Sequence, residues 1–210
     1  MPFENAYFPL APFLVAVLST VCGASESRTY HILTAFGYCM GPVGLYVLGR
    51  ELSRSWRAAF FAGMTWSLTS ASAMLFPEIL SDLGGLGLDQ RLKTIVCYGA
   101  GPQNLALALL PWALWILQKC LYPQSTPRCK ALFLAAAAIT ASTNAFGAVS
   151  MILTGACLYV ANRPGRNLLV SAGNVAATTA AGYCLLIGVV SPLVLRTIFL
   201  QSQHTAGDFR

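Results

Sequence analysis

The sequence predicts an all-α protein, a polytopic transmembrane helical bundle with about six to seven membrane segments, some of them short or broken. Hydrophobic residues make up 56% of the chain and charged residues 10%, whereas soluble domains carry about 25% charged residues. The charges are separated by uncharged runs of about 20 residues or more, and these runs lack the alternating pattern of barrel strands. We therefore expect one transmembrane helical domain over residues 1–210.

Six uncharged runs define the expected spans, because about 20 helical residues at a rise of about 1.5 Å cross a hydrocarbon core of about 30 Å. The runs lie between Glu4 and Glu26, Arg28 and Arg50, Arg57 and Glu78, Lys93 and Lys119, Lys130 and Arg163, and Arg166 and Arg196. Within them the expected helices cover residues 6–22, 30–49, 58–77, 102–118, 131–162 and 168–195. Between them, residues 94–101 are expected to form a re-entrant or interfacial piece.

The 13 basic residues give a formal charge of +6, but they are spread over short loops between the spans. Such a distribution is typical of topology signals and not of a nucleic-acid-binding face, so we expect a lipid bilayer as partner and no nucleic acid. The loops around residues 50–57, 119–130 and 163–166 are therefore expected on the cytoplasmic side. Counting these loops places Met1 inside.

Small and helix-breaking residues indicate how the spans pack. Gly37 and Gly41 have GxxxG spacing, which favours ordinary close packing of helices over a dedicated dimer interface. The run 131–162 is too long for one span, and both of its ends are basic. We expect two short helices hinged around Thr143–Gly147.

The cysteines and histidines exclude most metal and disulfide chemistry. Five of the seven cysteines lie in apolar surroundings without CxxC spacing. Cys120 and Cys129 flank a proline-containing loop and are placed to be bridged, yet a basic loop is expected in the reducing cytoplasm, which argues against a disulfide. The chain has two histidines, so a histidine metal site is not expected.

The longest polar interruption, residues 78–111, carries the candidate site residues in its first part, residues 78–103. Charges placed this close to lipid are commonly retained for function. Its glycines, GGLG, lack the spacing of a phosphate-binding loop. The polar and charged side chains of interest are Asp82, Asp89, Arg91, Lys93 and Gln103.

Several stretches resemble bacterial multi-pass glycosyltransferases of the GT-C superfamily, which depend on polyprenyl-phosphate sugars, and in particular the membrane region related to 6-pyruvoyl-tetrahydropterin synthase. The stretches are NAYFPLAPFLVAVLS, GPVGLYVLGRELSRSWRAAFFAGMTWSL and RLKTIVCYGAGPQNLALALLPWAL, together with the break at Thr143–Asn144 before a small-residue helix. The resemblance extends over most of the chain and is carried by apolar and small residues. The family's first external loop would directly precede Met1, so the resemblance places the N-terminus outside whereas the count of basic loops places it inside, and its orientation stays open at this point. We expect this chain to be part of a larger protein.

This resemblance implies a protein of the bacterial inner membrane that transfers a sugar from a polyprenyl-phosphate donor to an envelope glycan, lipid or protein. Arg91, Lys93 and Gln103 would bind the substrate, with the two cations on the donor phosphate. Asp82 and Asp89 are the catalytic candidates, for contact with the acceptor or with a metal. Such carboxylates would suit a divalent cation as cofactor. The sequence itself does not require a cofactor.

Two other classes of function stay open at this point. A transporter or flippase is favoured by the helix breaks at Pro102 and Asn144, although no span carries a buried acid or base of the kind that ion-coupled carriers use. A non-catalytic scaffold subunit is the third hypothesis.

Overall fold

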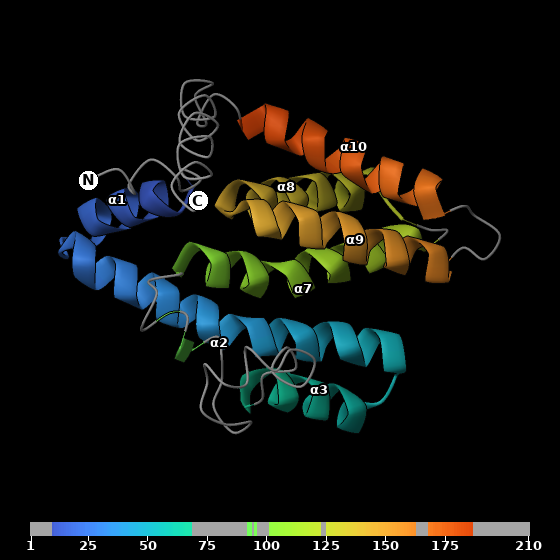
Figure 1. The fold of residues 1–210 in the computed structure, drawn as a ribbon, viewed down its shortest axis with the longest axis horizontal. Coiled ribbons are helices and arrows are strands. Elements are labelled where there is room, and N and C mark those ends of the chain that lie inside the picture. Colours follow the sequence, from blue (N-terminus) through green and yellow to red (C-terminus); the bar gives the residue numbers. More distant parts are fainter. Residues whose placement is uncertain are drawn as a thin grey trace, which may run out of the picture.

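The computed structural model describes residues 10–68, 92–93, 95, 101–122, 125–162 and 168–186, and every regular element within these ranges is a helix. This confirms the all-α class for the described part of the chain (Figure 1). The helices are α1 (Leu10–Cys22), α2 (Glu26–Ser53), α3 (Trp56–Leu68), α7 (Gly101–Leu121), α8 (Pro127–Thr143), α9 (Ala145–Asn162) and α10 (Leu168–Leu186).

Helix α2 is longer than the sequence predicts, because its ends are capped within charged segments. The hydroxyl oxygen of Ser25 accepts a hydrogen bond from the Arg28 amide at 3.4 Å and begins the helix. At the other end Arg54 has a left-handed conformation, with φ of 54°, and its amide donates to the Arg50 carbonyl at 3.0 Å. The predicted basic loop is therefore mostly helical, and only residues 54 and 55 separate α2 from α3.

The break expected in the long uncharged run is present. Helix α8 ends at Thr143 and α9 begins at Ala145, with Asn144 extended between them. The Asn144 side-chain oxygen accepts a hydrogen bond from the Phe146 amide at 2.8 Å, which replaces a backbone partner lost at the break. A Cβ on Gly147 would lie 2.8 Å from the Thr140 carbonyl oxygen, so the two helices approach closely because this residue is glycine. The prediction of two short helices is confirmed.

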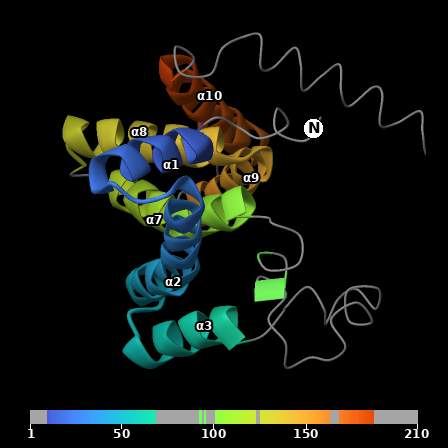
Figure 2. The same cartoon turned by 90° about the vertical axis from the view of Figure 1, so that its left-hand side faces the viewer.

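Helix α7 lies at the centre of the described part of the protein. In both views the helices are stacked in the order α3, α2, α7, the α8–α9 pair and α10 (Figure 1, Figure 2). Helix α7 contacts α2 on one side and both α8 and α9 on the other, and α10 covers α8 and α9. Helix α1 packs against α2 and, more lightly, against α8. The core cluster of this stack includes Leu110, Leu114, Phe133 and Met151.

Helices α2 and α7 run parallel along a contact that we call the α2–α7 seam. Contacting residue numbers increase together along both helices, in steps of seven. The seam consists of Gly37 against Leu105, Gly44 against Trp112, and Glu51 against Lys119. Repeats of seven with small residues opposite large ones are typical of knobs-into-holes packing. Gly37 therefore packs within its own chain, which confirms the interpretation of the GxxxG pattern as helix packing.

Polar side chains of α7 form hydrogen bonds with the backbone of α2 along the α2–α7 seam. The indole nitrogen of Trp112 donates to the Met40 carbonyl oxygen at 3.1 Å. The side-chain amide of Asn104, which is 3% exposed, donates to the Thr34 carbonyl oxygen at 3.4 Å. Where surrounding groups are apolar, each of these donors needs such a partner, and the small residues of α2 make the backbone accessible.

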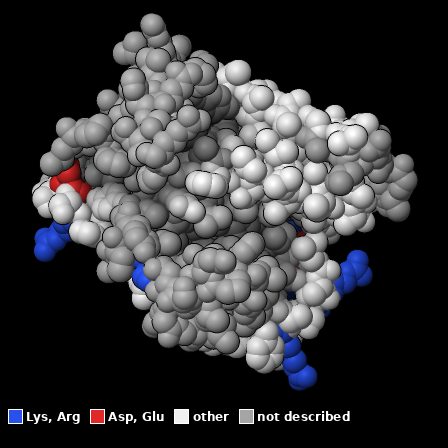
Figure 3. Space-filling view, in the orientation of Figure 1, with Lys and Arg blue, Asp and Glu red and all other residues white. Residues whose placement is uncertain are grey.

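Two described helices, α2 with 28 residues and α7 with 21, are long and apolar enough to span a membrane. Large apolar side chains are also exposed on several helices, among them Ile32, Phe61, Phe146 and Leu153, each more than 60% exposed. In Figure 3 most of the charged residues drawn in colour lie near the outline of the molecule. The described surface is therefore one that suits contact with lipid.

Candidate functional site

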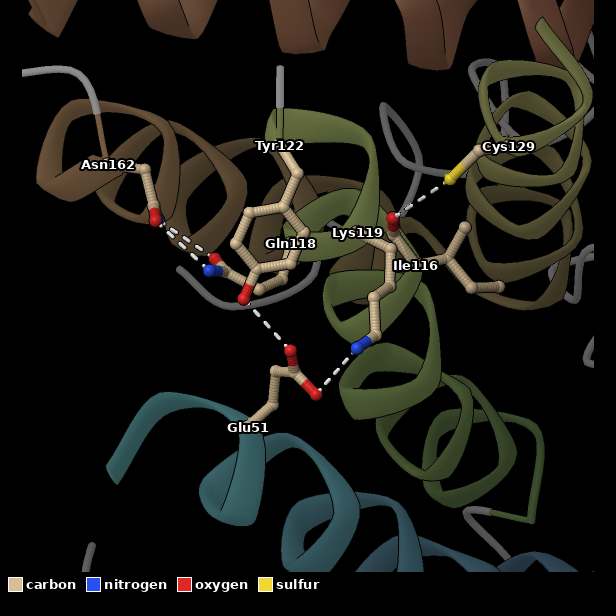
Figure 4. Close-up of polar contacts among 7 residues, drawn as sticks. All are labelled: Glu51, Ile116, Gln118, Lys119, Tyr122, Cys129 and Asn162. Atoms are coloured by element: carbon tan, nitrogen blue, oxygen red, sulfur yellow. Dashed lines mark hydrogen bonds and ion pairs between the residues drawn. The ribbon is translucent and has the colours of Figure 1, made fainter. Parts of the chain in front are cut away.

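The C-terminal ends of α2 and α7 meet in a group of charged and aromatic side chains that we call the basic end. The Lys119 ammonium lies 2.7 Å from one carboxylate oxygen of Glu51, and the Tyr122 hydroxyl donates to the other at 2.9 Å (Figure 4). The Glu51 carboxylate on α2 therefore accepts two bonds from the end of α7 at once, the ion pair with Lys119 and the hydrogen bond from Tyr122. The arrangement fixes the relative register of α2 and α7 at this end.

Aromatic rings surround the Lys119 ammonium. Its nitrogen lies 5.9 Å from the Trp115 ring centroid and 5.8 Å from that of Tyr122. The side chains of Lys119 and Glu51 are 40% and 22% exposed, so water screens their attraction, and such a pair contributes about 0.2–1 kcal/mol. The group is better suited to positioning side chains at a polar–apolar boundary than to stabilising the fold.

A pocket of about 510 Å³ opens beside this group. It is lined by Tyr46, Val47, Arg50, Glu51, Arg54, Trp115 and Tyr122. The charge of Glu51 is balanced by Lys119, whereas no described acidic residue pairs with Arg50 or Arg54. The pocket therefore combines excess positive charge with aromatic walls, which is the chemistry that accommodates an anionic group such as the phosphate of a lipid head group.

Other basic residues are brought to the same end. Arg57 lies in the first turn of α3 with its guanidinium 5.5 Å from the Trp56 ring centroid, and Arg128 and Lys130 lie in the first turn of α8. The end of α9 joins them through a reciprocal amide pair. In that pair Gln118 donates to Asn162 at 3.0 Å, and Asn162 donates back to Gln118 at 2.8 Å (Figure 4).

None of the five residues predicted from the sequence is described at the basic end. Asp82, Asp89 and Arg91 fall outside the described residues. Lys93 is half-buried in a short described helical piece, and Gln103 is half-buried in the first turn of α7. Gln103 and Lys119 are 16 residues apart on one helix, a separation of about 24 Å. Gln103 is therefore far from the basic end, and the assignment of all five residues stays a prediction.

The end of α7 that carries Gln103 has polar neighbours from α2. Gly101 lies directly against the Tyr30 hydroxyl and the Thr34 hydroxyl, so α7 begins in close contact with α2. Asn104 continues this polar contact one turn further along. Within the described ranges no three histidine, cysteine, aspartate or glutamate residues cluster as a metal site would require. The divalent cation also stays a prediction, since its candidate ligands lie outside those ranges.

The basic end contains the residues that sequence reasoning did not single out. Glu51, Lys119 and Tyr122 were assigned only to loops at the membrane surface. The signal that connects them is the spacing of seven in Gly37, Gly44 and Glu51, which places the acid on the same helix face as the glycines. This spacing points to a contact between Glu51 and Lys119 only when α7 is known to pack against this face of α2.

Comparisons of the chain with protein-family models, with curated proteins and with solved structures found no match.

Proposed function

We propose that the chain is a multi-pass membrane protein whose basic end lies at the cytoplasmic surface. The observation that carries this proposal is the convergence of separate basic segments at one end of the helix stack. The α2–α3 turn, the α7–α8 connection and the end of α9 meet there through Glu51, Lys119, Gln118 and Asn162. Basic connections on one side are the pattern that orients membrane proteins with that side in the cytoplasm.

The number of membrane segments in this proposal is six to seven, as the sequence predicts. Helices α2 and α7 have spanning length, while α8 and α9 have 17 and 18 residues and α10 has 19. Helices of about 17–19 residues reach about 26–28 Å, which suits a slightly thinned bilayer. The exposed apolar side chains and the aromatic residues of the basic end support the same placement.

Epitope insertion tests the orientation. A short epitope after Ser55 or after Ser125 lies in the connections at the basic end, whereas an epitope after Ala24 lies in the turn between α1 and α2, at the start of α2. We expect antibody to bind the first two in inverted membrane vesicles alone, and the third in right-side-out vesicles alone. Accessibility of all three from the same side would overturn the proposed topology.

For the activity we propose glycosyl transfer from a polyprenyl-phosphate sugar, at the end of α7 opposite the basic end. The support is the sequence resemblance together with the position of Gln103. If the basic end is cytoplasmic, the other end of α7 faces the external side, where the family that the chain resembles transfers sugars. That end carries Gln103, and Tyr30 and Thr34 of α2 lie against its first residue, Gly101. Lys93 and Arg91 would hold the donor phosphate there, with Asp82 and Asp89 near the acceptor.

The activity is tested in proteoliposomes that contain the full-length protein and a labelled polyprenyl-phosphate sugar. We expect sugar transfer, and a decrease of about tenfold or more in Lys93→Ala and in Gln103→Ala, because a lost hydrogen bond to a charged group costs about 1.5–3 kcal/mol. Arg128→Ala, at the basic end, is the matched control and is expected to retain the rate. Equal rates in all variants would remove this site assignment.

Two results of the same experiment would favour the other classes of function. Uptake of the labelled sugar into the vesicle lumen without its transfer would support a transporter or flippase. Absence of both transfer and uptake by a correctly inserted protein would support a scaffold role and contradict the proposed activity.

A further inference from the structure

The thiols of Cys120 and Cys129 meet where α7 ends and α8 begins. Their sulfur atoms are 2.7 Å apart, and both residues are half-buried. The Cys129 sulfur also lies 3.8 Å from the Ile116 carbonyl oxygen, one turn earlier on α7 (Figure 4). Six cysteines lie in the described part of the chain and all are free thiols, but this is the one sulfur–sulfur contact among them.

Local structure holds the two thiols in this position. Thr126 caps α8, since its hydroxyl oxygen accepts a hydrogen bond from the Cys129 amide at 3.4 Å. This cap places Cys129 in the first turn of α8, against the last turns of α7. The chain between the helices is short, so α7 and α8 are antiparallel neighbours and their facing turns stay together.

We propose that Cys120 and Cys129 form a reversible dithiol–disulfide site that reacts with low-molecular-weight disulfides of the glutathione type. A disulfide bond has a length of about 2.05 Å, so the two sulfurs need to approach by about 0.6 Å, a movement within the range of side-chain adjustment. The formed bond would join α7 to α8. The remaining described cysteines, Cys22, Cys39, Cys157 and Cys184, are exposed and are not part of this site.

The reaction is thiol–disulfide exchange in two steps. The Cys129 sulfur, as thiolate, attacks one sulfur of the small disulfide, forms a mixed disulfide and releases one small thiol. The Cys120 sulfur, after losing its proton, then attacks the Cys129 sulfur and releases the second small thiol. In total the protein loses two protons and two electrons, and the small disulfide takes up both and is reduced to two thiols.

The surroundings of Cys129 favour an anionic reagent. Arg128 and Lys130 flank it in the first turn of α8, and both side chains are exposed. Oxidised glutathione carries net negative charge, so these cations attract it. In a reducing compartment the pair rests as two thiols, and it is oxidised when the ratio of disulfide to thiol rises. This agrees with the free thiols of the structure and with the sequence argument against a permanent bridge.

Trypsin provides a direct test, because it separates the two cysteines into different peptides. Cleavage after Lys119, Arg128 and Lys130 places Cys120 in residues 120–128 and Cys129 in residues 129–130. The purified full chain is incubated with glutathione buffers of increasing oxidised fraction, alkylated and digested without reduction. We expect a linked 120–128/129–130 peptide pair whose yield rises with the oxidised fraction and falls again when reduced glutathione is restored.

Two variants and one denatured sample control the experiment. Cys157→Ser, which changes an exposed cysteine of α9, is expected to leave the linked yield unchanged. Cys129→Ser is expected to abolish the linked pair and leave Cys120 alone or with one glutathione. The site is refuted if the folded wild type carries single glutathiones on both cysteines without the link. Equal linkage rates in folded and denatured protein would also refute it, since the contact then plays no part.

Discussion

Gly44→Val is expected to destabilise the folded protein by about 2–4 kcal/mol, the largest effect of any substitution proposed for this chain. A Cβ at this position would lie 2.6 Å from the indole nitrogen and 2.8 Å from the Cδ1 atom of Trp112. The ring must therefore move, and its hydrogen bond to the Met40 carbonyl oxygen is lost. In detergent, the midpoint of thermal unfolding should decrease by roughly 5–15 °C.

Gly173→Val is the matched control for this prediction. Gly173 is also a helical glycine, on α10, but a Cβ there would meet no atom within 4 Å. Gly173→Val makes the same change in helix propensity as Gly44→Val but causes no clash. Its midpoint of thermal unfolding should therefore change by about 1–3 °C. Trp112→Phe, which removes the indole nitrogen, should restore part of the stability lost in Gly44→Val. Equal midpoints for the two valine variants would contradict the α2–α7 seam.

The second large effect is expected at the amide pair that joins α7 to α9. Asn162→Leu should cost about 1–3 kcal/mol, because it leaves the amide of Gln118, which is 5% exposed, without its partner. Gln118→Leu should cost less, because Asn162 is exposed to solvent and also donates to the Leu158 carbonyl oxygen at 2.8 Å. The two single variants therefore have unequal expected costs, although they break the same pair.

A double-mutant cycle measures this coupling. Gln118→Leu/Asn162→Leu removes both amides, leaves no unsatisfied buried group, and should be more stable than Asn162→Leu alone. Free energies of unfolding are obtained from denaturant titrations in mixed micelles, with Thr154→Val, on the exposed side of α9, as the control. A double variant whose cost equals the sum of the single costs would show that the two amides act independently.

The class of the fold and the positions of most helix boundaries follow from local sequence features. Uncharged runs, capping residues and the Asn144 break are encoded within a few residues of where they act. The prediction placed the start of α7 at Pro102, and the helix begins at Gly101. The end of α2 differs more, since Arg50 and Glu51 were assigned to a loop. Long charged side chains can extend from a helix end toward water, so charge does not mark the end of the helix.

The site was harder to predict, for a physical reason. Glu51 and Lys119 are far apart in the chain, and their contact depends on α2 and α7 lying parallel in one register. The sequence shows that Gly37 and Gly44 lie on one face of α2, but it does not show which helix packs against that face. Similarly, the loop between Cys120 and Cys129 is compatible with many conformations. The Thr126 cap and the packing of α8 on α7 bring the two sulfur atoms together.

What the residues specify without reference to the fold is the apolar character of the segments and the helical state of this protein. The effects of composition, charge spacing and helix-breaking residues on a segment depend on local free energies. These free energies can be evaluated one segment at a time. Which helices become neighbours depends on the fit of Gly44 to Trp112 and of Gly147 to Thr140, and on the convergence of the basic connections at one end. Such fits involve two distant segments at once, so they exist only when the chain has folded.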